Sequence, residues 1–121
     1  MLFRSWHLRE AVRLNPGDPG YANDLAWTLA TAPDPQLRDP AEALRLASSL
    51  VEAKSPPDPN DLDTLAAAYA AAGRFEEAAD AALRAVDLAS AQGRAALRDA
   101  IQRKLALYRA RQPFVDSPAG G

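Results

Sequence analysis

Residues 62–89 read LDTLAAAYAAAGRFEEAADAALRAVDLA and carry the clearest helical pattern in the chain. Large residues recur at helical spacing on both sides of Gly73, and alanine fills most of the positions between them. Small side chains at Ala66 and Ala78 let two antiparallel helices approach closely, while Tyr69 and Phe75 fill the space beside them. Glycine readily adopts the left-handed conformation that ends a helix. The stretch therefore predicts two packed helices, over residues 61–72 and 75–90.

The preceding segment, residues 21–53, has the same order of large and small residues but a longer turn. It reads YANDLAWTLATAPDPQLRDPAEALRLASSLVEA, and its Leu25–Ala26 pair corresponds to Leu65–Ala66. The turn is five residues longer than the downstream one and carries three prolines, at Pro33, Pro35 and Pro40. Proline cannot continue a helix but suits its first position, where Asp39 supplies an N-cap. The prolines therefore predict an enlarged, stiffened turn that ends one helix at Thr31 and starts the next at Pro40.

The rest of the sequence is also helical in pattern. Together with the two segments above, it predicts a single domain over residues 1–112. Apolar spacing predicts further helices over residues 3–14, 21–31, 39–54 and 93–111. The last has an apolar face formed by Leu97, Ala100, Ile101, Leu105 and Tyr108. Proline and glycine in residues 15–20 and 55–60 separate the helices. Residues 113–121, PFVDSPAGG, are expected to form a flexible tail.

The order of large, small, aromatic, glycine and aromatic residues resembles the tetratricopeptide repeat (TPR), a helix–turn–helix unit of about 34 residues. In this comparison residues 59–92 are a well-matched repeat and residues 21–55 a divergent one. Residues 1–16 resemble the second helix of a partial repeat, and residues 93–112 a C-terminal capping helix. The stretches LAWTLATAPDPQLRDP and LALYRARQPF resemble the C-terminal TPR segment of large bacterial multidomain proteins. The resemblance implies an all-α fold, a short right-handed α-α superhelix with a C-terminal capping helix.

In the TPR family the first helices of the repeats line a concave groove that holds a peptide or a partner helix. The resemblance places in that groove eight residues of this chain: Asn23, Trp27, Ala30, Thr31, Asp63, Ala67, Ala70 and Ala71. These residues lack the cations with which chaperone-binding relatives hold a terminal carboxylate. The groove is therefore expected to be apolar and mildly acidic, and to suit a segment with aliphatic side chains and one basic residue. Two interpretations of Trp27 stay open: an anchor for a ligand, or packing against the enlarged turn.

Two other surfaces are candidates for contact with partners. The first helix lacks the partner helix of a complete repeat, which predicts an open apolar side for self-association, formed by Phe3, Trp6, Leu8 and Val12. The alternative is that Phe3 and Trp6 fold back on the neighbouring helix. The last helix carries a basic face of Arg94, Arg98, Arg103 and Lys104, whereas residues 21–92 have twelve acidic and five basic residues. This asymmetry favours head-to-tail contacts or an acidic partner, with a merely solvated cap as the alternative.

Composition and motifs exclude several classes of function. The chain has no cysteine, one histidine, and no motif for phosphate binding, hydrolysis or metal binding, so we predict no catalytic residue, no metal and no cofactor. A sequence pI of about 5.3 argues against a nucleic-acid partner. No apolar run is long enough for membrane insertion or a secretory signal, which predicts a cytoplasmic location by default.

Three functional hypotheses follow from these observations. The first is a non-catalytic module for protein–protein interaction, which binds a peptide or helix of a partner protein. The second is a self-assembling structural element, a homo-oligomer joined through the open first helix. The third is a terminal accessory segment of a larger bacterial enzyme or membrane protein.

Overall fold

The computed structural model describes residues 2–116, and the side chains of residues 6–116. Every regular element in this part of the chain is helical, which confirms the all-α prediction. The elements in chain order are α1 (Leu2–Leu14), α2 (Pro19–Thr31), the 3-10 helix η1 (Pro35–Leu37), α3 (Pro40–Glu52), α4 (Pro59–Ala71), α5 (Phe75–Ala91) and α6 (Ala95–Arg109).

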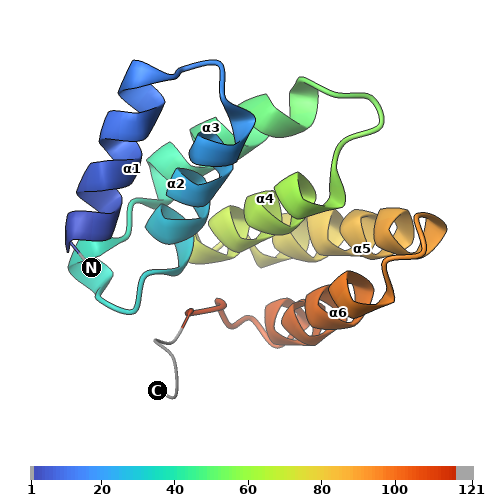
Figure 1. Cartoon of the computed structure of the whole chain (residues 1–121). Coiled ribbons are helices and arrows are strands. Elements are labelled where there is room, and N and C mark those ends of the chain that lie inside the picture. The colour runs from blue at the N-terminus through green and yellow to red at the C-terminus, as the bar shows by residue number, and fades with distance from the viewer. Residues whose placement is uncertain (1, 117–121) are drawn as a thin grey trace.

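Each α-helix packs against the next along the chain, and α2 also packs against α4 (Figure 1). The most extensive contacts join α4 to α5 and α5 to α6. After α6 the chain runs back beneath α4 toward α2 (Figure 1). This return brings the end of the described chain against a helix that lies far away in the sequence.

Four helical elements begin at an Asp-Pro pair, because aspartate and proline each stabilise the first turn of a helix in a different way. The aspartate side chain accepts a hydrogen bond from a free backbone N–H, and proline needs no partner for its nitrogen. The capping residues are Asp18 for α2, Asp34 for η1, Asp39 for α3 and Asp58 for α4. Consequently α2 and α4 begin at Pro19 and Pro59, two residues before the positions predicted from apolar spacing.

The enlarged turn between α2 and α3 has the predicted bounds. Helix α2 ends at Thr31 and α3 begins at Pro40, where the Asp39 carboxylate accepts from the Glu42 amide at 3.2 Å. The turn contains η1 and is attached to the end of α2, since the Asp39 amide donates to the Leu29 carbonyl at 2.9 Å. The prolines thus separate the two helices without leaving the connection loose.

The turns after α4 and α5 share one geometry. Gly73 and Gly93 have φ of +79° and +71°, the left-handed region that favours glycine. In each turn the following arginine amide donates at 2.8 Å to a carbonyl five residues earlier, Arg74 to Tyr69 and Arg94 to Ala89. The glycine predicted to make the α4–α5 turn does so, and Gly93 repeats the device.

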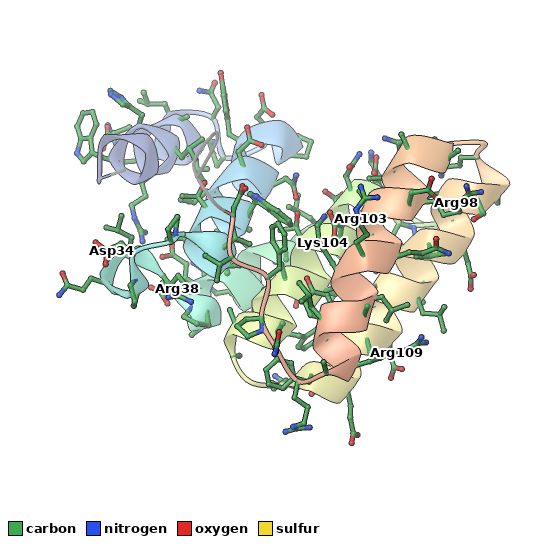
Figure 2. All side chains as sticks on the ribbon, turned by 90° about the horizontal axis from the view of Figure 1, so that it is seen from below. Asp34, Arg38, Arg98, Arg103, Lys104 and Arg109 are labelled. Atoms are coloured by element: carbon green, nitrogen blue, oxygen red, sulfur yellow. The ribbon has the colours of Figure 1, made fainter. Side chains whose placement is uncertain are left out.

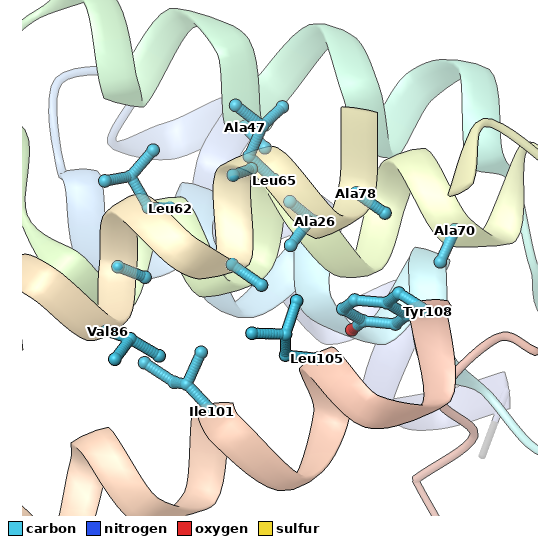
Figure 3. Close-up of a cluster of buried hydrophobic side chains, with 14 residues drawn as sticks. Ala26, Ala47, Leu62, Leu65, Ala70, Ala78, Val86, Ile101, Leu105 and Tyr108 are labelled. Carbon is cyan, nitrogen blue, oxygen red and sulfur yellow. The ribbon is translucent and has the colours of Figure 1, made fainter. Parts of the chain in front are cut away.

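Alanine dominates the core where helices cross. Ala66 and Ala78 are fully buried at the α4–α5 contact, and Tyr69 and Phe75 pack partly buried against the same cluster, as their spacing predicts. Helix α6 contributes larger side chains, and Figure 3 shows Ile101, Leu105 and Tyr108 directed toward α5 and α4. Small residues permit close helix approach, while α6 fills the remaining space with bulk.

Candidate functional site

A buried ion pair joins α4 to α6. The Lys104 ammonium lies 2.8 and 3.1 Å from the two carboxylate oxygens of Asp63, and the two side chains retain only 13% and 11% of their exposure. Burial raises the pKa of the Asp63 carboxyl above its ordinary value, and the charge of Lys104 opposes this rise without cancelling it. The pair therefore fixes the position of α6 on α4 while leaving a carboxylate in a costly environment.

Tyr108 lies one turn further along α6 and is almost completely buried, at 1% exposure. Its hydroxyl has no hydrogen-bond partner among the described residues. Burial, together with the negative charge of Asp63, raises the pKa of this phenol well above its ordinary value. Tyr108 is accordingly a neutral packing residue, and Asp63 and Lys104 carry the charge at this site.

Lys104 also contacts Trp27 of α2 and Phe114. The Lys104 ammonium lies 4.9 Å from the centroid of the Trp27 ring and 5.3 Å from that of Phe114. The two aromatic rings are 5.6 Å apart and tilted by 42°. The indole N–H of Trp27 donates to a carboxylate oxygen of Asp116 at 2.9 Å. One cation thus contacts two aromatic faces, a favourable arrangement when water is partly excluded.

The backbone completes these contacts at the C-terminus of α2. The Asp116 amide donates to the Thr31 carbonyl at 2.9 Å. Thr31 is the last residue of α2, so its carbonyl has no partner within the helix. We call residues 113–116 the tail segment. We call Trp27, Thr31 and Lys104, which contact it, together with Asp63, which pairs with Lys104, the tail-contact face.

The tail segment reaches this face because the chain reverses after α6. Arg111 has φ of +59°, and the Gln112 amide donates to the Leu107 carbonyl at 2.9 Å, which repeats the geometry of the two glycine turns. The Arg111 guanidinium stacks 5.2 Å from the Phe75 ring centroid. Residues 113–116 begin the tail that was predicted to be flexible, and here Phe114 and Asp116 contact partners on α2 and α6. Residues 117–121 lie outside the described chain.

The residues expected to line a groove occupy three different environments. Trp27, Thr31 and Asp63 belong to the tail-contact face. Ala30, Ala67 and Ala70 are at most 2% exposed and pack between helices, and Ala71 is half-buried beside them. Asn23 is half-buried, and its Oδ1 has no hydrogen-bond partner among the described residues. Trp27 contacts the tail segment. The sequence had left open two other roles for this residue, an anchor for a ligand and packing against the enlarged turn.

The first helix divides its apolar residues between the core and the surface. Leu8 and Val12 pack against the buried cluster around Leu25 and Leu29, so α1 covers α2 with this side. Trp6 remains 58% exposed, with its ring edge against His7. The side chain of Phe3 lies outside the described part of the structure. Among the proposed self-association residues whose side chains the structure describes, Trp6 is exposed, whereas Leu8 and Val12 are half-buried.

The cationic residues of α6 and of its N-cap, Arg94, have different surroundings. Lys104 points toward the tail segment, whereas Arg98 and Arg109 project near opposite ends of the helix (Figure 2). Arg98 pairs with Asp99 at 3.0 Å, and the Arg94 guanidinium lies 3.9 Å from Asp58. Arg103 is exposed and forms no ion pair with another described residue. Lys104 therefore differs from its neighbours in being an internal rather than a surface cation.

Other kinds of site are not evident in the described chain. Within residues 2–116 no three histidine or acidic side chains gather as metal ligands, and no helix is long and apolar enough to cross a membrane. A shallow pocket of about 400 Å³ lies beside the α4–α5 turn, lined by residues 73–77 and Arg111. Two of these residues, Arg74 and Glu77, form an ion pair at 2.6 Å, so their charges neutralise each other.

Comparisons of the chain with protein-family models, with curated proteins and with solved structures found no match. Sequence reasoning missed Phe114 and Asp116, although an aromatic and an acidic residue after a helix end were a signal. It also treated Asp63 and Lys104 separately, since nothing local connects them.

Proposed function

We propose that this chain is a non-catalytic protein–protein interaction module that binds an extended segment of another protein on the tail-contact face. The observation that carries the proposal is the tail segment itself. It engages the face through one backbone hydrogen bond, one side-chain hydrogen bond and one aromatic contact, which are the kinds of contact that peptide ligands make. A surface that holds one extended segment has the chemistry to hold another.

The resemblance to TPR units supports the same function. We infer that α2–α3 and α4–α5 are two TPR-like units of a short right-handed superhelix and that α6 is its capping helix. In that arrangement α2 and α4 are first helices of their units, and they supply Trp27, Thr31 and Asp63. The position of these residues agrees with the surface that the family uses for partner segments.

The experiment combines selection of peptides with mapping of their binding site. Random 12-residue peptides are selected against the immobilised full chain, and each winner is titrated into ¹⁵N-labelled protein. The chain has two tryptophans, so its spectrum contains an indole signal at the face, from Trp27, and a remote control, from Trp6. We expect the Trp27 signal to move and the Trp6 signal to stay. Failure to select any binder, or binders that move only Trp6, would refute the proposed function.

A second candidate function is self-association through α1. Trp6 and Leu14 on this helix are 58% and 65% exposed, so α1 offers large apolar side chains to a partner surface. The occupant would be a second copy of the chain. Light scattering over a hundredfold range of concentration should then show a mass that grows with concentration in the natural chain and not in Trp6→Ala. A constant mass near 12.9 kDa would eliminate this candidate.

A further inference from the structure

We propose that the tail-contact face selects extended segments carrying an aromatic residue and, two positions later, an aspartate or glutamate, and that Phe114 and Asp116 block the face as an internal copy of this ligand. The inference rests on the proposed function and specifies both the partner chemistry and its regulation. A partner segment must displace the chain's own tail segment before it binds.

The spacing of two residues follows from the geometry of the tail segment. In an extended chain alternate side chains point the same way. Phe114 and Asp116 both contact Trp27, whereas the intervening Val115 is 38% exposed. The face therefore recognises the first and third positions and leaves the middle one unspecified. Phe-Val-Asp is one sequence that satisfies this pattern.

The acidic position is defined by hydrogen bonding rather than by a free cation. Lys104 is already paired with Asp63, and the Asp116 carboxylate instead accepts from the indole of Trp27. The same residue must also have a backbone N–H, because its amide donates to the Thr31 carbonyl. An internal aspartate or glutamate meets both conditions, and a proline at this position does not.

The aromatic position is defined by Trp27 and Lys104 together. Phe114 lies within reach of the indole face and of the ammonium, with centroid distances of 5.6 and 5.3 Å. An aliphatic side chain would keep some apolar contact but would lose the attraction between the cation and the ring. The face therefore prefers an aromatic residue over the aliphatic ones that the sequence alone suggested.

Tethering gives the internal copy its advantage. Only residues 110–112 separate α6 from the tail segment, so the local concentration of Phe114 and Asp116 at the face is in the millimolar range or above. Few contacts hold the segment, and both side chains are only half-buried. Because the tail segment is held by a short link and few contacts, a free segment from another protein can displace it.

The test compares a free peptide binding to the full chain with and without its internal competitor. The probe is the acetylated and amidated hexapeptide QPFVDS, which has the sequence of residues 112–117. All proteins carry Trp6→Phe, so that fluorescence reports Trp27 alone. We expect Phe114→Ala with Asp116→Ala to bind the probe about tenfold more tightly than the parent. Val115→Ala is the matched control and should bind as the parent does.

Peptide variants test the recognition pattern itself. On the double variant, replacing the peptide's phenylalanine by leucine or its aspartate by asparagine should weaken binding about fivefold to tenfold, consistent with loss of one contact of this kind. Equal affinity of the parent and the double variant would overturn the internal block. Equal affinity of the three peptides would overturn the pattern.

Two measurements keep the result interpretable. If circular dichroism shows that the double variant is unfolded, Asp116→Asn replaces it, since this change keeps the shape of the side chain and weakens only one hydrogen bond. It should raise probe affinity by a smaller factor, and an unchanged affinity would overturn the internal block. Selected peptides that shift the Trp27 indole but lack the aromatic-x-acidic pattern would overturn this inference while supporting the proposed function.

Discussion

The buried pair between Lys104 and Asp63 predicts a large, pH-dependent loss of stability when the cation is removed. In Lys104→Met the side chain stays unbranched and flexible but loses its charged end, so the buried Asp63 carboxylate loses its counter-charge. Breaking a buried pair in this way typically costs about 3 to 5 kcal/mol. Because the two side chains keep 13% and 11% of their exposure, we expect the lower end, about 3 kcal/mol at pH 7.5. For a chain of this size that lowers Tm by roughly 12 °C.

The sign of the pH dependence follows from the raised pKa of Asp63. A carboxyl whose folded-state pKa lies above its unfolded value contributes stability below the unfolded pKa, near 4, and loses that contribution as pH rises through the folded pKa. Removing Lys104 removes the charge that lowers this pKa, so the folded value rises further and the window extends upward. The loss of stability in Lys104→Met should therefore be smaller at pH 5 than at pH 7.5, by about 1 kcal/mol.

The assay is urea denaturation followed by far-ultraviolet circular dichroism at both pH values. Arg103→Met is the matched control, because it removes the same charge from an exposed position one residue earlier in α6 and should change stability by less than about 0.5 kcal/mol. Adding Asp63→Asn to Lys104→Met should restore most of the lost stability. A loss of stability below about 1 kcal/mol, or one that is equal at pH 5 and pH 7.5, would show that Lys104 does not stabilise a buried Asp63 carboxylate.

Three further predictions concern the packing and turns of the helices. Ala78→Leu places a large side chain at the fully buried α4–α5 contact and should cost about 1 to 3 kcal/mol in thermal unfolding, whereas Ala91→Leu at an exposed position should cost little. Gly73→Ala should lose about 1 kcal/mol because φ is +79°, while Gly17→Ala, in open space without a positive φ, should not. Tyr108→Phe removes a buried hydroxyl that has no partner among the described residues, so Tm should stay equal or rise; a fall of several degrees would show that this hydroxyl is bonded.

Local rules were sufficient for most of the helices. The stop at Thr31 and the start at Pro40 were predictable because proline and a capping aspartate act within a few residues of the chain. The early starts of α2 and α4 were missed because apolar spacing outweighed the Asp-Pro pairs, although these pairs stand plainly in the sequence. The same rule applied to all four pairs would have placed every one of these starts.

The candidate site was predictable only in part, because its pieces are far apart along the chain. The resemblance to TPR units singled out Trp27, Thr31 and Asp63, and the charge pattern singled out Lys104. Neither the resemblance nor the charge pattern predicted that Lys104 pairs with Asp63, which is 41 residues away. The three buried alanines among the expected groove residues were included by position in the repeat, whereas helix packing decides whether such a position remains exposed.

Periodicity, caps and turns act within one or two helices. The amino-acid sequence was therefore enough to predict that this chain is helical, where most helices begin and end, and which small residues lie between α4 and α5. The return of residues 113–116 to α2, where Asp116 bonds to Trp27 across 89 residues, became visible in the three-dimensional packing alone. That contact depends on the reversal at Arg111 and on the distance between α6 and α2. No local pattern encodes such a distance, because it is set by the packing of all the helices between them.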